Sequence, residues 1–203
     1  IQHVSRIEDF PADKWQQLIN IMLVGPALLT QAFLPAMISN NHGHFMTVAS
    51  SASYFSLPNL CAYSMSKTAA LAFLESLRAE LRAVYKACRV RTSVVTPTKV
   101  RTVLAEGLNE GDDDFLMPVL EPIQVARAMA DTLNSGLSRN ISLPLGSALL
   151  PYLRALPEWY RGALRAMGNT DALVTPESIS RGQQALRGHQ SNLDHMKKLG
   201  VHS

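Results

Sequence analysis

The order of helix-like and strand-like segments is the feature of this sequence that most restricts its fold. Stretches with apolar residues every three or four positions alternate with short apolar runs rich in β-branched residues. The predicted helices span 13–39, with a kink at Pro26, 62–86 and 122–133, and the predicted strands span 44–50, 90–97 and 140–146. This alternation is typical of a parallel sheet joined by crossover helices. We therefore predict an α/β fold.

Length and composition indicate one globular domain. The chain has 203 residues, of which 47% are apolar and 17% are charged, so it can bury a sizeable core and has no disorder signature. After Asp171 the sequence becomes polar. We predict a catalytic part over residues 1–170 and a polar C-terminal tail over residues 171–203.

Charge and cysteine usage argue against several kinds of site. The 19 basic and 16 acidic residues are spread along the chain without a basic block, which argues against a nucleic-acid partner. Cys61 and Cys88 have neither a disulfide framework nor zinc spacing, so we expect reduced thiols in the cytoplasm. His42 and His44 lack a third ligand, and the aspartates of 112–114 are typical of a solvated loop, so no metal site is predicted.

The region from residue 15 to residue 41 contains no charged residue and is long enough for a membrane span. Asn20, Thr30, Gln31 and two prolines within it instead favour a helix that is buried in protein. The first ten residues carry no signal-peptide pattern. Because such a helix is too apolar to face water on all sides, we predict that it forms an interface between two copies of the chain.

Polar side chains follow two of the predicted strands and begin the helix between them. Ser50 and Ser51 end the first strand, and the segment 96–102, with the sequence TPTKVRT, ends the second. Tyr63 and Lys67 are four residues apart near the start of the intervening helix, so they share one helix face, with about 5–6 Å between their Cβ atoms. Ligands of parallel sheets bind beyond the carboxyl ends of the strands, so these groups form one candidate site.

The segment HFMTVASSASYFSLPNLCAYSMSKTAALAFLESLRAEL, residues 44–81, resembles the active-site segment of the short-chain dehydrogenase/reductase family. Ser50 stands thirteen residues before Tyr63, Pro58 stands five before it, and Tyr63 and Lys67 form Tyr-x-x-x-Lys. The run TQAFLPAMISNNHGHFMTVAS further resembles the branch of retinal and lipid-alcohol dehydrogenases. The resemblance extends from about residue 5 to residue 145.

This resemblance implies an oxidoreductase that interconverts a lipophilic alcohol and its carbonyl by hydride transfer. Tyr63 would be the acid/base, and Ser50 would hold the substrate oxygen. Lys67 would lower the pKa of the phenol from about 10 and would bind the nicotinamide ribose.

The same resemblance implies NADP(H) or NAD(H) as cofactor of the complete protein. Tyr63, Lys67, Pro97, Val100 and Thr102 match its cofactor contacts. It also implies a lipophilic small-molecule substrate, a homodimer, and a cytoplasmic protein that associates peripherally with the ER membrane surface or with lipid droplets.

Three departures from the family pattern limit this interpretation. Thr98 replaces the glycine after Pro97, which would matter if that position needs the backbone freedom of glycine. Met22 occupies the position of an asparagine that extends the proton relay, and Asn20 could substitute only after a local change of helix register. Neither Gly-x-x-x-Gly-x-Gly nor Asn-Asn-Ala-Gly is present. We therefore expect the C-terminal part of a Rossmann-like, doubly wound parallel sheet, incomplete without N-terminal strands.

Two other interpretations stay open. The chain could be a truncated, catalytically inactive dehydrogenase-like product that acts as an interaction partner or has no function. Ser64 and Lys67 also match the Ser-x-x-Lys motif of acylating enzymes, although the companion motifs of that class are missing.

The apolar segment 145–168 fits an interfacial segment, a lid over the substrate or ordinary packing.

Overall fold

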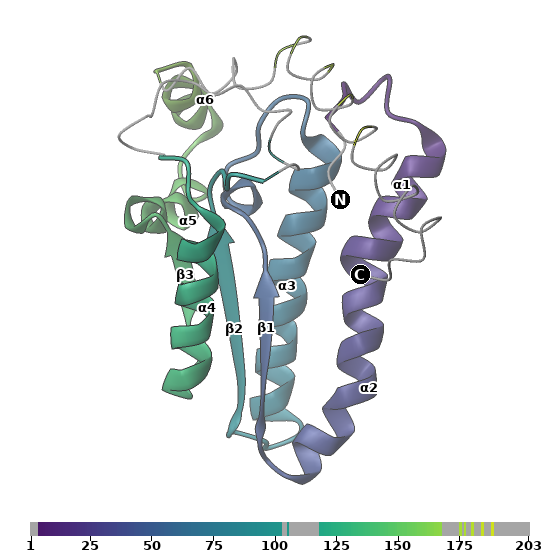
Figure 1. Cartoon of the computed structure of the whole chain (residues 1–203), viewed down its shortest axis with the longest axis vertical. Helices are drawn as coiled ribbons and strands as arrows, with labels where there is room; N and C mark the ends of the chain where they lie inside the picture. Colours follow the sequence, from purple (N-terminus) through teal and green to yellow (C-terminus); the bar gives the residue numbers. More distant parts are fainter. Residues whose placement is uncertain are drawn as a thin grey trace.

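A three-stranded parallel sheet forms the centre of the molecule (Figure 1). The computed structural model describes residues 4–102, 105, 118–167, 175, 177, 180, 184 and 188. The strands are β1 (Gly43–Val48), β2 (Val90–Pro97) and β3 (Asn140–Leu143), in the order β1-β2-β3. Gly43 pairs with Val90 and Val94 pairs with Asn140. The predicted α/β class is confirmed.

Helices connect and cover these strands. The segments α1 (Ala12–Ile19), η1 (Asn20–Val24) and α2 (Gly25–Ser39) follow one another as a long helical rod that lies beside α3 (Cys61–Ala83) (Figure 1). The crossover from β1 to β2 is α3, and the crossover from β2 to β3 is α4 (Pro122–Ser135). After β3 come η4 (Leu145–Leu149), α5 (Leu150–Leu153) and α6 (Glu158–Met167).

The central strand β2 is buried on both faces. Val94 packs with Leu71 and Leu74 of α3, whereas Val95 packs with Val125 of α4. Consecutive side chains of a strand point to opposite faces, so α3 and α4 cover opposite faces of the sheet. The leucines that the sequence places at helical spacing in α3 are all buried: Leu71, Leu74, Leu77 and Leu81.

Two strands end earlier than predicted, and both ends have a local cause. The first strand stops at Val48, because Ser50 caps the short 3-10 helix η2 (Ser51–Ser53) and accepts a hydrogen bond from the Ala52 amide at 3.2 Å. The third stops at Leu143, because Pro144 has no amide hydrogen to continue the pairing. The predicted strand 90–97 has the observed bounds.

The irregular turn of the rod lies directly before Pro26. Residues Asn20–Val24 form a π-helical turn, and the Gly25 amide donates to the Asn20 carbonyl five residues earlier. Pro26 has no amide hydrogen for an ordinary helical bond, so a local change of register at this point is expected. The structure thus has a π turn directly before Pro26, and the predicted kink of the helix axis stays a prediction.

Much of the rod is exposed in the single chain. Its buried residues are Leu18 and Thr30, while Leu28, Leu29 and Phe33 are about 60% exposed. By length and apolarity the helix Ala12–Ser39 could cross a membrane, a test that core helices of soluble proteins also pass. Part of the apolar surface of the rod packs inward through Leu34, Met37 and Ile38, and the rest faces outward, where the predicted contact with a second copy would lie.

Two predicted features lie outside the described residues. These are most of the loop 107–118, with the aspartates of 112–114, and most of the tail 171–203.

Cys61 and Cys88 are free and exposed. His44 donates to or accepts from Ser93 at 2.8 Å, so it links β1 to β2.

The packing between α3 and β2 gives a stability prediction. Leu74→Ala should lower the free energy of unfolding by about 2–5 kcal/mol, because the side chain is buried against Ala49 and Val94 and its removal leaves a cavity. Urea denaturation followed by circular dichroism measures the change. Val84→Ala, at an exposed position beyond the end of α3, should stay within about 0.5 kcal/mol. Equal losses in the two variants would show that this contact does not organise the core.

Candidate active site

Ser50 and Tyr63 lie together at the carboxyl end of β1. Ser50 is buried directly after the strand, and Tyr63 belongs to the first turn of α3. The Ser50 hydroxyl is near enough to the Tyr63 phenol to lower the pKa of that phenol. The structure therefore brings together two side chains that are thirteen positions apart in the sequence.

Local contacts fix the loop and the helix that carry this pair. The Thr68 hydroxyl donates to the Ser53 carbonyl at 3.0 Å, which ties α3 to the loop after Ser50. The Ser66 hydroxyl donates to the Tyr63 carbonyl at 2.7 Å. Both bonds are intramolecular and partly buried. They therefore hold the segments that carry Ser50 and Tyr63 in place before any ligand binds.

Lys67 lies one helical turn after Tyr63, on the same face of α3. Its Nζ atom is 5.8 Å from the centre of the Tyr63 ring. The same Nζ donates to the carbonyl of Val48, the last residue of β1, at 2.9 Å. Ser50, Tyr63 and Lys67 thus lie close together at one edge of the sheet.

Burial acts on both ionisable groups of this cluster. It raises the pKa of the Tyr63 phenol, and the hydrogen bond from Ser50 counteracts the rise only in part. It also lowers the pKa of the Lys67 ammonium. The sequence-based expectation was that Lys67 would lower the pKa of Tyr63. In the structure desolvation is the larger effect, because it disfavours the charged form of each partner.

An open cavity of about 510 Å³ lies next to Lys67, between the rod, β1 and α3. Its lining is apolar apart from Thr47 and Lys67, and Lys67 is its only charged residue. Met22 lines this cavity, while Asn20 is exposed and accepts a hydrogen bond from Gln16 at 2.8 Å. Although the π turn changes the register here, it does not bring the Asn20 amide to the site.

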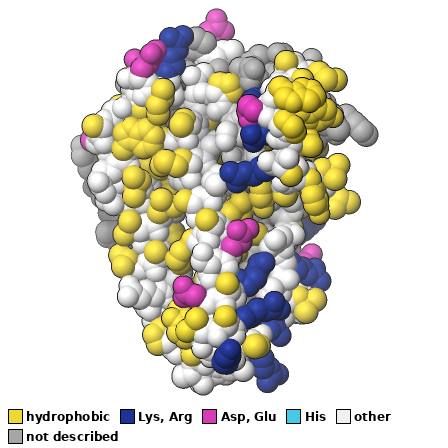
Figure 2. Space-filling model, turned by 180° about the vertical axis from the view of Figure 1, so that it is seen from behind, with side chains coloured by type: hydrophobic (Ala, Val, Ile, Leu, Met, Phe, Trp, Pro, Cys, Tyr) yellow, Lys and Arg dark blue, Asp and Glu magenta, His cyan; other side chains and the backbone are white. Residues whose placement is uncertain are grey.

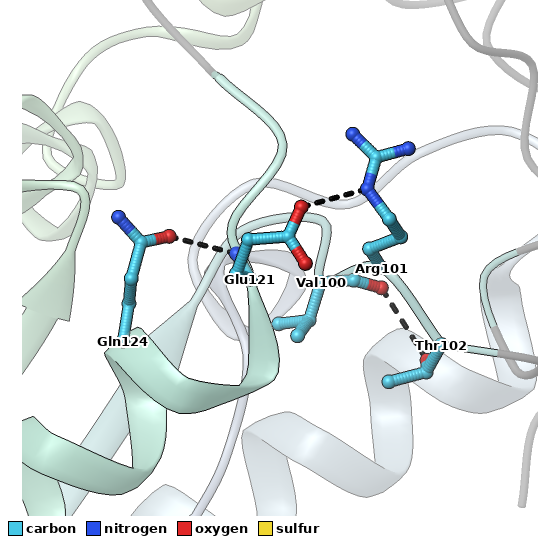
Figure 3. Close-up of polar contacts among 5 residues, drawn as sticks. All are labelled: Val100, Arg101, Thr102, Glu121 and Gln124. Carbon is cyan, nitrogen blue, oxygen red and sulfur yellow. Dashed lines mark hydrogen bonds and ion pairs between the residues drawn. The ribbon is translucent and has the colours of Figure 1, made fainter.

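The segment after β2 is held against the start of α4 (Figure 3). Val100 forms a parallel bridge with Leu120, and the Arg101 Nε atom lies 2.8 Å from the Glu121 carboxylate. The Thr102 hydroxyl donates to the Val100 carbonyl at 3.3 Å. Glu121 and Gln124 form a capping box that starts α4. Nothing in spacing or periodicity marked Arg101 and Glu121 as the pair that positions this segment.

Thr98 fits its position without backbone strain. Non-glycine residues with positive φ in the described part of the chain are Asn41, Asn59 and Lys86, so Thr98 does not use the conformational freedom of glycine. Its amide donates to the Leu143 carbonyl at 2.9 Å. Its buried hydroxyl has no hydrogen-bond partner among the described residues.

The arrangement argues against acyl transfer by Ser64. Its hydroxyl is buried and has no hydrogen-bond partner within the described part of the protein. The Lys67 ammonium, which would have to activate it, instead bonds to the Val48 carbonyl. Ser64 is therefore out of reach of a substrate.

Comparison with known proteins gives three further observations. A sequence profile described as "short chain dehydrogenase" matches residues 1–113. Estradiol 17-beta-dehydrogenase 11 of Homo sapiens is 41% identical over 138 residues, which cover 67% of this chain and 44% of that protein. Epidermal retinol dehydrogenase 2 of Mus musculus is 34% identical over 125 residues, covering 62% of this chain and 40% of the relative. The chain thus spans less than half the length of these two relatives.

Among solved structures, the fold is similar to a gluconate 5-dehydrogenase from Burkholderia cenocepacia in complex with NADP and tartrate. The TM-score is 0.61 at 19% sequence identity, and the match covers 73% of this chain and 61% of that one. At this identity the likeness establishes the fold alone. Because the match leaves part of the larger fold uncovered, the chain corresponds to one part of a Rossmann-fold dehydrogenase.

The burial of Tyr63 gives a pH prediction. The absorbance difference between the wild type and Tyr63→Phe should titrate with a midpoint above the value of about 10 for free tyrosine, because burial raises this pKa. The unfolded chain then ionises first, so the stabilising contribution of the group is lost as the pH rises above about 10. A midpoint below 10 would mean that the ammonium of Lys67 outweighs desolvation.

Proposed function

Because the chain belongs to the short-chain dehydrogenase family, we propose that it carries the proton-transfer site of an oxidoreductase that interconverts a lipophilic alcohol and its carbonyl with NADP(H) or NAD(H). Family membership rests on the profile match over residues 1–113, more than half of the chain. The observation that carries the proposal is the placement of Ser50 beside Tyr63, with Lys67 one helical turn away.

Each member of this cluster has a distinct task in the proposed reaction. Tyr63 gives a proton to the carbonyl oxygen during reduction and takes it back during oxidation. Ser50, which lies beside the same phenol, donates a hydrogen bond that holds the substrate oxygen there. The raised pKa keeps the phenol protonated near neutral pH, and that form is the acid that carbonyl reduction needs.

The residues near this cluster fit the nicotinamide end of a dinucleotide. Lys67 is the one charged group in the lining of the adjacent cavity, and its ammonium can donate to ribose hydroxyls. Pro97, Val100 and Thr102 border the same edge of the sheet. When bound, the cofactor supplies or accepts the hydride. The phosphate end needs residues that this sequence does not contain, because it has no Gly-x-x-x-Gly-x-Gly.

The proposed substrates are lipophilic alcohols of the steroid or retinoid type, and the proposed location is a lipid surface facing the cytoplasm, such as the ER membrane or a lipid droplet. The names of the two relatives denote a dehydrogenase of estradiol and one of retinol, which supports this substrate class. The exposed apolar rod also supports an association with lipid or with a second copy of the chain.

The alternative is a catalytically inactive dehydrogenase-like chain that acts as an interaction partner. One observation favours it: Met22, instead of an amide side chain, lines the cavity next to Lys67. The alternative predicts that the cluster stays inactive even when a dinucleotide-binding half is supplied.

A chimaera tests the role of Tyr63. We would join the dinucleotide-binding half of human estradiol 17-beta-dehydrogenase 11 to this chain and measure oxidation of a lipophilic alcohol. Tyr63→Phe should lower kcat by about 10²- to 10⁴-fold, because the general acid/base is lost, while cofactor binding changes little. Tyr54→Phe is the matched control, since burial raises the pKa of that phenol too. Near-normal turnover of the Tyr63 variant would end the assignment.

The exposed rod gives a prediction about assembly. The chimaera should be a homodimer, because Leu29 and Phe33 expose a large apolar surface that a second copy can cover. The double variant Leu29→Glu and Phe33→Glu should be monomeric in sedimentation equilibrium, whereas Ile123→Glu, at an exposed position of α4, should leave the mass unchanged. A wild type that stays monomeric at tens of micromolar would contradict the dimer.

A further inference from the structure

The segment after β3 exposes apolar side chains more fully than any other described part of the chain. Five large hydrophobic residues have the highest exposed fractions, and all lie between residues 145 and 167: Leu145 at 85%, Met167 at 84%, Trp159 at 74%, Tyr152 at 73% and Leu149 at 68%. We call these five residues the apical apolar surface. Such a concentration of exposed apolar area on a folded protein marks an interaction site.

Helix α6 exposes apolar side chains on its outward side, whereas an ordinary surface helix exposes polar ones. None of its residues is buried, and its outward side carries Trp159, Ala163, Ala166 and Met167, which are at helical spacing. Its arginines, Arg161 and Arg165, are about three-quarters covered and both pair with Glu158. A helix that only packed on the protein would place its apolar stripe inward.

The inward-facing arginines attach this segment to the loop of the candidate site. The Arg165 guanidinium lies over the Phe55 ring at 5.6 Å from its centre. Arg154, just after α5, donates to the Ser53 carbonyl at 3.3 Å. The loop between Ser50 and α3 therefore connects the apical apolar surface to the proton-transfer cluster.

The view from behind shows where this surface lies (Figure 2). Hydrophobic side chains gather at the upper right of that face, where α6 lies, with more of them below. Basic side chains gather instead near the lower end of this face. A few Lys and Arg side chains also lie beside the upper-right hydrophobic group.

We propose that the apical apolar surface inserts into the interface of a phospholipid layer and places the candidate site at the lipid boundary. The inference rests on the proposed function for its substrate class, because a lipophilic alcohol would then reach Tyr63 without crossing water. Trp and Tyr are the residues that membrane interfaces favour, and Leu and Met supply apolar contact beside them.

A fluid lipid layer explains these side chains better than a second copy of the chain. They project singly from three short segments, η4, α5 and α6, and a fluid surface adapts to such projections without a matching pocket. The arginines of α6 are engaged by Glu158, so binding should not need anionic lipid. The side chains should enter neutral phosphatidylcholine vesicles, and the binding should depend little on salt.

Trp159 can report this insertion directly. The chain has two tryptophans, and Trp15→Phe leaves Trp159 as the only one while keeping an aromatic ring against Phe10. Adding phosphatidylcholine vesicles to this 203-residue variant should shift the Trp159 emission to shorter wavelength. Brominated acyl chains should quench it, and aqueous iodide should quench it less than before.

Paired variants separate this surface from other lipid-binding parts. In the same background, Leu145→Ser with Leu149→Ser should weaken vesicle binding by at least about tenfold, because two exposed leucines no longer enter the lipid. Val84→Ser, which changes an apolar residue exposed to 67% beyond the end of α3, should leave the affinity unchanged. Circular dichroism of each variant checks that the fold is kept.

The possible outcomes distinguish this inference from the proposed function. Retained binding with unshifted Trp159 emission would mean that another surface, such as the rod α1–α2, binds lipid, which overturns this inference but not the lipid association. A complete lack of vesicle binding would overturn both. A shift that depends on protein concentration without vesicles would show that a second copy covers the surface, and would also overturn the inference. Turnover of a short water-soluble alcohol by the chimaera tests the chemistry separately.

Discussion

The parallel pairing of β1 with β2 through the crossover helix α3 is the constraint on which the rest of the structure depends. The pairing runs from Gly43 opposite Val90 to Val48 opposite Val95, and the Ala49 amide extends it with a bond to the Val95 carbonyl at 2.8 Å. A crossover between parallel strands must begin at the carboxyl end of the first strand. The start of α3, with Tyr63 and Lys67, is therefore at the same edge as Ser50 and Pro97. The crossover that forms the sheet therefore also places the residues of the candidate site at one edge.

The same arrangement decides the electrostatics of the cluster. The packing that holds α3 against the sheet also removes water from Tyr63 and Lys67, so burial opposes the charged form of each. Coulomb attraction across one helical turn is not the leading effect. Burial therefore favours a neutral Tyr63 phenol, with the Ser50 hydroxyl beside it. This state suits proton donation to a carbonyl oxygen.

The sequence predicted the features that follow from periodicity and local chemistry. Strand 90–97 is an uninterrupted β-branched run, and the leucines of α3 repeat at helical spacing, so both were predictable. The grouping of Ser50, Tyr63 and Lys67 followed from strand order together with the family resemblance.

Other features depend on tertiary contacts between distant residues. Arg154 reaches the Ser53 carbonyl across 101 positions, and Arg101 meets Glu121 across 20, and no local pattern encodes either contact. The π turn before Pro26 and the raised pKa of Tyr63 were not predicted, because the first depends on helix register and the second on how fully α3 covers the phenol. The outward apolar surface of the rod is what the predicted interface between two copies needs, and that interface stays a prediction.

Deuterium transfer tests the central claim, that this edge of the sheet supports hydride transfer between an alcohol and a nicotinamide. The chimaera would be incubated with NAD⁺ or NADP⁺ and a lipophilic alcohol deuterated at the carbinol carbon, and the reduced cofactor analysed by mass spectrometry. The account predicts that the label moves from that carbon to the nicotinamide ring. Carbonyl product without deuterium on the nicotinamide, or no product from a folded chimaera that binds the cofactor, would contradict it.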